Sequence, residues 1–156
     1  MKVFVESEAG SNQKKLYDEK TLAYKRTMSV SRAYPYPYGF ILDTTNVDGD
    51  NLDCFIITDT RLESGKMYEC EPIGLMEQFE TAWEPEKKGE EEKDHNILAI
   101  LSGESREVDE SVKTKLTEFV SHVFDHIPHH KNRVGQFLGK EEALEEMRKL
   151  SGQIKK

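Results

Sequence analysis

The chain has 156 residues, enough for one domain with a single sizeable hydrophobic core. Its formal net charge of −8 disfavours nucleic acid and anionic membrane surfaces as partners. No stretch approaches the ~20 consecutive apolar residues of a membrane-spanning helix, and the first residues lack the apolar segment of a secretory signal. The only cysteines, Cys54 and Cys70, lie within apolar runs and predict reduced, buried thiols. We therefore expect one soluble cytoplasmic domain, residues 1–156.

Short β-strands are predicted along the first hundred residues, where brief apolar or alternating runs are separated by turn residues. The predicted strands are residues 3–6, 22–27, 39–42, 53–58, 66–73 and 97–101. Many short strands with turns between them indicate a small closed barrel.

The hydrophobic period changes near residue 110. Apolar residues recur at helical spacing between Val112 and Ile127, Asp109 is a suitable N-cap, and Pro128 is expected to stop the helix. A second amphipathic helix is predicted between Ala143 and Ile154. Both apolar stripes are expected to face the core.

Residues 81–93 resemble an insertion between two strands. Glutamates and lysines alternate along this segment, which predicts a solvated, mobile loop. Its carboxylates are poor candidates for metal ligands, because a flexible loop rarely holds a metal in fixed geometry.

The most informative segment is Asp48-Gly49-Asp50-Asn51-Leu52-Asp53, which leads into the apolar run after Asp53. Three carboxylates so close together repel one another unless a cation or a proton offsets them. Gly49 allows the backbone to curl the three acids toward one point. An acidic turn at the edge of a strand is a rigid place for a hard divalent metal, although such a segment alone is more often a solvated turn.

Two further segments accompany the acidic turn and together carry a family resemblance. Upstream, Tyr34-Pro35 is followed by Tyr38-Gly39-Phe40-Ile41; downstream come Pro72-Ile73-Gly74 and then Asp94. This order and spacing, across roughly residues 6 to 101, resembles the soluble family I inorganic pyrophosphatases.

The resemblance implies a mainly β, α+β fold: a five-stranded closed barrel of the oligonucleotide-binding (OB) type with two flanking α-helices. It also implies hydrolysis of pyrophosphate to two phosphates with two or more Mg²⁺ ions. Bacterial relatives are commonly hexamers, so a homo-oligomer is expected.

By the same resemblance, the functional residues of the family fall on defined positions. Asp48, Asp53 and Asp94 match the carboxylates that hold the first pair of magnesium ions, and Asp50 the base that deprotonates the attacking water. Arg26 and Lys15 match phosphate-binding residues, with Lys14 as the alternative to Lys15. Tyr38 matches a tyrosine that contacts phosphate. Glu80 matches an aspartate that binds additional metals, and Glu6 matches an acidic residue at the rim of the site.

The chain departs from the family pattern at several positions. Tyr17 stands where a glutamate is usual, and Asn96 stands where a lysine binds phosphate. A Tyr-Lys pair that grips the second phosphate is replaced by Val123-Phe124 or by Ile127-Pro128, depending on the alignment. Two lost lysines would cost several kcal/mol of substrate binding, at roughly 1.5–3 kcal/mol for each charge-assisted hydrogen bond. The basic residues just past the helix could replace them: His129, His130, Lys131 and Arg133.

Three functions remain open at this point. The first is magnesium-dependent hydrolysis of pyrophosphate. The second is hydrolysis of another phosphoanhydride, because loss of the Tyr-Lys pair would admit a phosphate that carries an organic group. The third is a catalytically weak metal-binding relative that acts as an interaction module through residues 81–93.

Overall fold

The structure is a computed structural model that describes residues 1–45, 50–82 and 90–154, and the side chains up to residue 149 within them. Asp48 and Gly49 of the acidic turn therefore lie outside the described residues.

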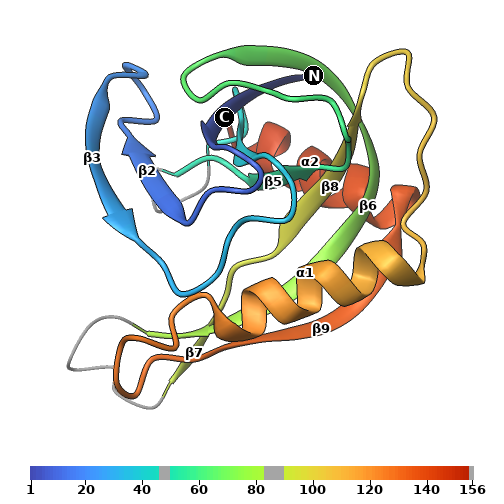
Figure 1. Ribbon diagram of the computed structural model, residues 1–156. Helices are drawn as coiled ribbons and strands as arrows, with labels where there is room; N and C mark the ends of the chain where they lie inside the picture. Colours follow the sequence, from blue (N-terminus) through green and yellow to red (C-terminus); the bar gives the residue numbers. More distant parts are fainter. Residues whose placement is uncertain (46–49, 83–89, 155–156) are drawn as a thin grey trace.

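Five strands of the described chain form a closed ring. β1 (Lys2–Ser7) pairs with β4 (Tyr38–Ile41), which pairs with β5 (Asp53–Ile56). β5 runs parallel to β8 (Asn96–Leu101), β8 pairs with the long β6 (Met67–Thr81), and β6 returns to β1. Figure 1 shows these strands curving around a common interior. The five-stranded barrel expected from the resemblance is confirmed.

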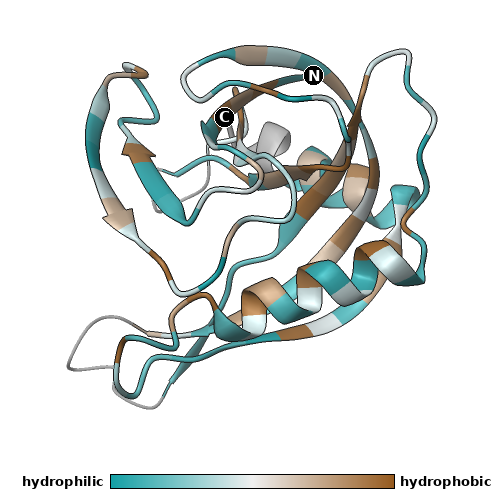
Figure 2. Cartoon of the chain, viewed as in Figure 1, coloured by the Kyte–Doolittle hydropathy of each residue, from teal (hydrophilic) through white to brown (hydrophobic). Residues whose placement is uncertain are grey.

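Side chains alternate across the barrel wall, and both faces are buried. Cys54 and Ile56 of β5 point into the barrel interior with Val3 and Ile97, whereas Phe55 points outward, to the apolar layer under the first helix. A strand that is buried on both faces has a nearly continuous apolar sequence. This is why β5 and β8 were predictable, and Figure 2 shows both as brown segments.

The close packing of β1 against β4 depends on Gly39. A Cβ atom built at Gly39 would lie 1.8 Å from the carbonyl oxygen of Phe4. Any side chain at this position would push the two strands apart. Gly39 therefore fixes the place of its neighbour Tyr38 at the start of β4.

Four of the described strands lie outside the ring. β2 (Gln13–Tyr17) and β3 (Tyr24–Ser29) form a separate hairpin, seen at the left of Figure 1. β9 (Asn132–Gly139) pairs with β6 and extends the sheet. β7 (Glu91–Lys93) pairs with the end of β6. The loop prediction for 81–93 is therefore wrong for Thr81 and for residues 91–93, and residues 83–89 lie outside the described chain.

The two helices cover different parts of the barrel. α1 (Glu110–His122) lies along β9, and its buried residues Val112, Leu116, Phe119 and Val120 pack on the outer face of the barrel. α2 (Lys140–Ile154) contributes Ala143 and Met147 to the interior cluster. Asp109 caps α1, as predicted, by accepting a hydrogen bond from the Val112 N–H at 2.9 Å.

α1 ends earlier than the sequence pattern predicts. The helix stops at His122, and residues 123–127 continue as turns in which the Ile127 N–H donates to the Phe124 carbonyl at 2.9 Å. Proline disfavours helical geometry in the residue before it, which is consistent with the loss of regular helix ahead of Pro128. In the described part of the chain, no helix has the length and apolar character needed to cross a membrane.

Candidate active site

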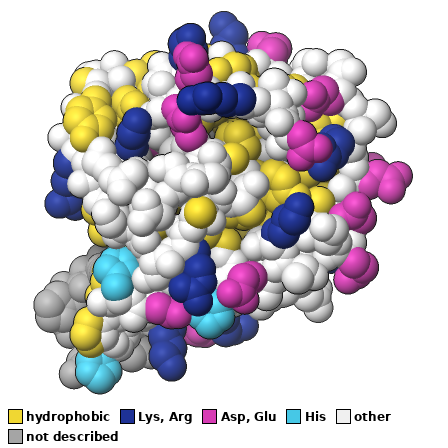
Figure 3. All heavy atoms as spheres, viewed as in Figure 1, with side chains coloured by type: hydrophobic (Ala, Val, Ile, Leu, Met, Phe, Trp, Pro, Cys, Tyr) yellow, Lys and Arg dark blue, Asp and Glu magenta, His cyan; other side chains and the backbone are white. Residues whose placement is uncertain are grey.

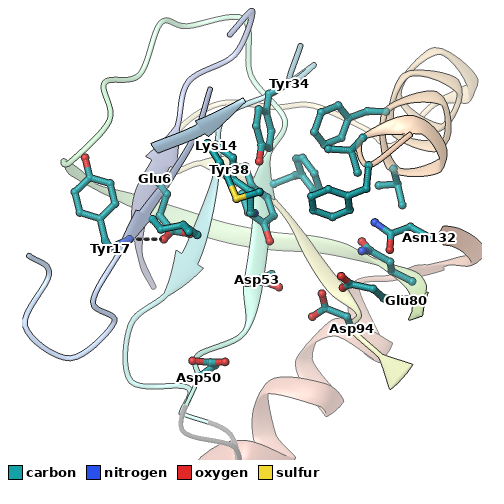
Figure 4. Close-up of a pocket in the computed structure, with 18 of the residues that line it drawn as sticks. Glu6, Lys14, Tyr17, Tyr34, Tyr38, Asp50, Asp53, Glu80, Asp94 and Asn132 are labelled. Carbon is teal, nitrogen blue, oxygen red and sulfur yellow. Dashed lines mark hydrogen bonds between the residues drawn. The ribbon is translucent and has the colours of Figure 1, made fainter. Parts of the chain in front are cut away.

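A cavity of about 820 Å³ opens between the β2–β3 hairpin, one end of the barrel and the end of α1 (Figure 4). Among the described residues, its lining includes six carboxylates and three basic side chains. They are Glu6, Glu19, Asp50, Asp53, Glu80 and Asp94, with Lys14, Lys25 and Arg26. The fold thus brings together every described residue that the sequence assigned to the site except Lys15, and the cavity carries an excess of negative charge.

Asp53 and Asp94 form the centre of the acidic group. Asp53 opens β5, and the parallel register places it opposite Asn96, two residues past Asp94. The Asp94 N–H donates to the Gln78 carbonyl at 2.9 Å, which ties this loop to β6. Burial raises the pKa of the Asp53 carboxyl well above its usual range, and the charge and hydrogen bond of Asp94 raise it further. Without a cation, the charged form of Asp53 is therefore disfavoured.

The backbone around Asp50 is held by its neighbour Asn51. The Asn51 Oδ1 accepts hydrogen bonds from the Thr44 N–H at 3.2 Å and from the Thr45 hydroxyl at 3.1 Å. The Asn51 N–H donates to Glu19 Oε1 of the hairpin loop at 2.8 Å. Asp50 itself is exposed at the edge of the cavity. Asp48, the third acid of the motif, lies outside the described residues.

The hairpin turns one face toward the cavity, and its register decides which lysine lies there. Lys14 pairs with Met28 and Leu16 pairs with Arg26, and all four residues line the cavity. Side chains of neighbouring residues in a strand point to opposite faces. Lys15, which pairs with Thr27, is absent from the lining. The geometry favours Lys14, the alternative that the spacing left open.

The Lys14 ammonium group lies over the Tyr38 ring, 5.1 Å from its centre. Burial alone would lower the pKa of Lys14, but the charges of Tyr34, Glu6 and Asp53 outweigh burial and raise it. Lys14 therefore stays protonated. Burial, followed by the charges of Asp53 and Asp94, raises the pKa of Tyr38 well above its usual range. Tyr38 remains a neutral phenol that can donate a hydrogen bond.

Glu6 lies deeper on the hairpin side and is 7 % exposed. Its Oε2 atom accepts a hydrogen bond from the Tyr17 N–H at 3.3 Å. Burial raises the pKa of Glu6 to about 7, against the opposing effects of Lys14 and the Tyr17 N–H. A cation nearby would stabilise the charged form.

Glu80 has two neighbours, His130, which the sequence named only as a replacement phosphate contact, and Asn132, which the sequence did not identify. His130 Nε2 lies 2.9 Å from Glu80 Oε1, and both side chains are largely buried. Asn132 faces Glu80 across the β6–β9 pairing, and within the described part of the chain its buried Oδ1 atom has no hydrogen-bond partner. In Figure 4 the carboxyl groups of Asp53, Glu80 and Asp94 point toward one another, with Asn132 beside Glu80. The strand β9 that carries Asn132 was not predicted, so no signal placed it at the site.

The basic residues that follow α1 are not among the residues that line the cavity. Arg133 makes two hydrogen bonds to Glu91, at 2.9 and 3.1 Å, and stacks 4.1 Å from the centre of the Phe79 ring. Lys131 pairs with Thr81 through its backbone. Neither lines the cavity. His129 is exposed, and Figure 3 shows histidines on the outer surface at the end of α1.

The other departures from the family pattern also have structural partners. The Tyr17 hydroxyl lies 2.8 Å from Ser64 Oγ, so it bridges to the barrel. Asn96 is buried and donates through Nδ2 to Gln78 Oε1 at 2.6 Å. The cavity wall at the end of α1 is apolar at both positions that the resemblance offers for the Tyr-Lys pair: Val123, Phe124 and Ile127 line it.

Comparison with known proteins agrees with this geometry. The sequence pattern of the inorganic pyrophosphatase family matches residues 3–155. The chain belongs to the inorganic pyrophosphatase family.

Relatives of the family cover almost the whole chain. An inorganic pyrophosphatase from Nanoarchaeum equitans is 32 % identical over 163 aligned positions, covering 98 % of this chain and 96 % of that protein. The structure of an inorganic pyrophosphatase from Thermus thermophilus superposes with a TM-score of 0.82 at 25 % identity, covering 100 % of this chain and 91 % of that one. A Neisseria gonorrhoeae pyrophosphatase with a TM-score of 0.84, at 23 % identity, shares the fold, with coverage of 100 % and 91 %.

Pyrophosphatases of this family depend on metal ions, and the oxygen-rich cavity suits hard divalent cations. Burial and the charge of Asp94 disfavour ionisation of Asp53, and the buried Asn132 Oδ1 has no hydrogen-bond partner among the described residues. Within residues 1–45, 50–82 and 90–154, no three acidic, histidine or cysteine side chains are arranged closely enough to hold one metal ion together. Pairs of carboxylates among the described residues therefore suit a bound cation. Asp48 lies outside the described residues.

Proposed function

We propose that this protein hydrolyses inorganic pyrophosphate to two phosphates, using a water molecule and Mg²⁺. One observation carries the proposal: the Asp53–Asp94 carboxyl pair, exposed Asp50, Arg26 and Lys14 all line one cavity. The membership of the chain in the inorganic pyrophosphatase family supports the same reaction.

We assign the metal-binding role to Asp53 and Asp94, together with Asp48. Glu80 and Glu6 would hold further ions at the two sides of the cavity. Magnesium bound to these carboxylates would neutralise the substrate charge and lower the pKa of a nearby water. The excess of carboxylates over basic side chains supports this assignment, because a multiply charged anion would otherwise be repelled from the cavity.

The remaining residues act on the substrate and on the water. Asp50, at the exposed edge, accepts the proton of the attacking water. Arg26 presents a planar pair of donors to phosphate oxygens, and Lys14, rather than Lys15, supplies a second positive charge. The Tyr38 hydroxyl, which keeps its proton, donates a hydrogen bond to a phosphate oxygen.

A second candidate function is the hydrolysis of a phosphoanhydride that bears an organic group. The apolar wall of Val123, Phe124 and Ile127 favours it. A catalytically inactive interaction module has no comparable support among the described residues.

We also propose that the protein acts in the cytoplasm as a homo-oligomer, with the hexamer implied by the family as the expected size. Cys54 and Cys70 are buried and unbridged, which is consistent with a reducing compartment. Sedimentation analysis of the purified protein tests the hexamer.

The decisive assay measures phosphate released from pyrophosphate by the purified protein, with Mg²⁺ and with excess chelator. We expect turnover that requires the metal. Side-by-side rates with nucleotides and tripolyphosphate separate the two candidate reactions. A folded protein that releases no phosphate from any of these compounds would refute the proposed activity.

A further inference from the structure

One end of the cavity is lined by apolar side chains. Phe124 and Ile127, beyond the end of α1, are only partly buried, so their side chains are accessible. Together with the opposite hairpin face, the apolar lining is Leu16, Met28, Phe119, Val120, Val123, Phe124 and Ile127. A volume of about 820 Å³ falls in the range of roughly 300–1,000 Å³ that is usual for organic ligands.

The apolar end is continuous with the charged end. The Tyr38 ring lies beneath the Lys14 ammonium group, and its centre is 5.6 Å from that of Tyr34. The Tyr34 ring in turn lies 4.5 Å from that of Phe119 on α1. A molecule with its phosphates at Lys14 would therefore meet an aromatic surface that leads directly to the apolar wall.

Charge decides which kind of molecule fits both ends. Inorganic pyrophosphate carries charge on both phosphoryl groups, and placing an unpaired charge against an apolar wall is costly. None of the described basic residues beyond α1 lines this end of the cavity. An ester group on one phosphate would remove charge at that end and bury apolar surface instead.

We propose that the cavity accepts diphosphate monoesters of apolar alcohols, with the two phosphates at the acidic and basic end and the organic group against Phe124 and Ile127. The inference rests on the proposed function of the same site. In the reaction, the water oxygen bonds to the terminal phosphorus and the bridging P–O bond breaks. The electron pair leaves with the organic monophosphate, and the water proton passes to Asp50.

Binding tests the inference without turnover. The probes are methylenediphosphonate, whose P–C–P bridge resists hydrolysis, and its methyl, propyl and pentyl monoesters, measured by calorimetry with Mg²⁺. We expect affinity to rise about fourfold for each methylene that is buried. Affinity that is independent of chain length, or lower for the esters than for the parent compound, would overturn the inference.

Two variants locate the organic group, and a third provides the matched control. Phe124→Asn and Ile127→Asn should each reduce the dependence on chain length while the parent compound still binds. Leu144→Asn changes an exposed leucine on α2, outside the cavity, and should preserve the full dependence. Retention of that dependence in both cavity variants would overturn the placement. Thermal unfolding confirms that each variant is folded. The measurements of the ester series on the unaltered protein test the inference without any variant.

The two proposals fail separately. Phosphate release from pyrophosphate without any gain from the alkyl chain refutes only the present inference. Chain-length-dependent binding without release of phosphate refutes only the proposed hydrolysis.

Discussion

Asp53 and Asp94 lie beside one another because β5 pairs in parallel with β8, and burial together with the charge of Asp94 raises the pKa of the Asp53 carboxyl. Two neighbouring acids are unfavourable for the folded chain at neutral pH. Such a pair is retained where a cation offsets its charge.

Replacing one acid of this pair should separate stability from activity. For Asp94→Asn we expect the metal-free protein to gain about 1 kcal/mol of unfolding free energy at pH 7, because Asp53 loses a repulsive neighbour. Phosphate release with Mg²⁺ should fall by about 100-fold or more, since metal charge contributes several kcal/mol to such reactions. Urea unfolding and a phosphate assay measure the two effects. A variant that is less stable and fully active would contradict this role.

Asp50 should affect the chemical step and not the binding of substrate. Loss of a general base typically costs about 10²- to 10⁴-fold in rate, so Asp50→Asn should lower kcat by that factor and leave KM nearly unchanged. Asp59→Asn is the control, because Asp59 forms only a surface ion pair with Arg106. Full turnover by the Asp50 variant would exclude it as the base.

The two neighbouring lysines should behave differently. Lys14→Met removes a buried positive charge from the cavity and keeps the apolar stem. At about 1.5–3 kcal/mol for a charge-assisted bond, kcat/KM should fall roughly 10- to 100-fold. Lys15→Met, on the opposite face of β2, should change kcat/KM by less than about twofold. The reverse order of effects would restore Lys15 as the phosphate ligand.

The metal-free protein should become less stable as the pH rises from about 4.5 to about 7. Burial raises the pKa of Glu6 from 4.5 to about 7, so the folded chain keeps a proton that the unfolded chain releases over this interval. The contribution of Glu6 to the unfolding free energy is complete below its pKa in the unfolded chain and is lost as the pH rises through its pKa in the folded chain. The loss is at most about 3 kcal/mol. Asp53, whose pKa is also raised, acts in the same direction.

Urea unfolding with chelator at pH 5 and pH 8 measures the slope of the unfolding free energy against pH. Glu6→Gln should flatten it, because an amide does not titrate. An equal slope in the variant would show that other carboxyls carry the effect.

The sequence predicted those strands and helices whose buried faces produce a clear pattern of apolar residues. β5 and β8 are apolar on both faces, and α1 has a capping aspartate and a clear apolar stripe. The family resemblance placed Asp50, Asp53 and Asp94 in one site with Tyr38. The structure brings them to one cavity because β4, β5 and β8 are neighbours in the barrel.

The missed features depend on pairing between distant segments. β2 has no strong apolar alternation, and only its register with β3 shows that Lys14 and not Lys15 faces the cavity. β9 is stabilised by β6, so neither Asn132 nor the partner of Arg133 was visible locally. The contact of His130 with Glu80 likewise depends on the turn after α1.

The parallel pairing of β5 with β8 also affects how the molecule folds. These strands are joined through most of β6 and β7, so their alignment requires closure of a long chain segment, a slow kind of event. A chain that has formed only its local hairpins would hold Asp53 and Asp94 far apart and offer magnesium no paired carboxylates. The ion would therefore favour the completed barrel over its precursors, and we expect it to slow unfolding more than it speeds refolding.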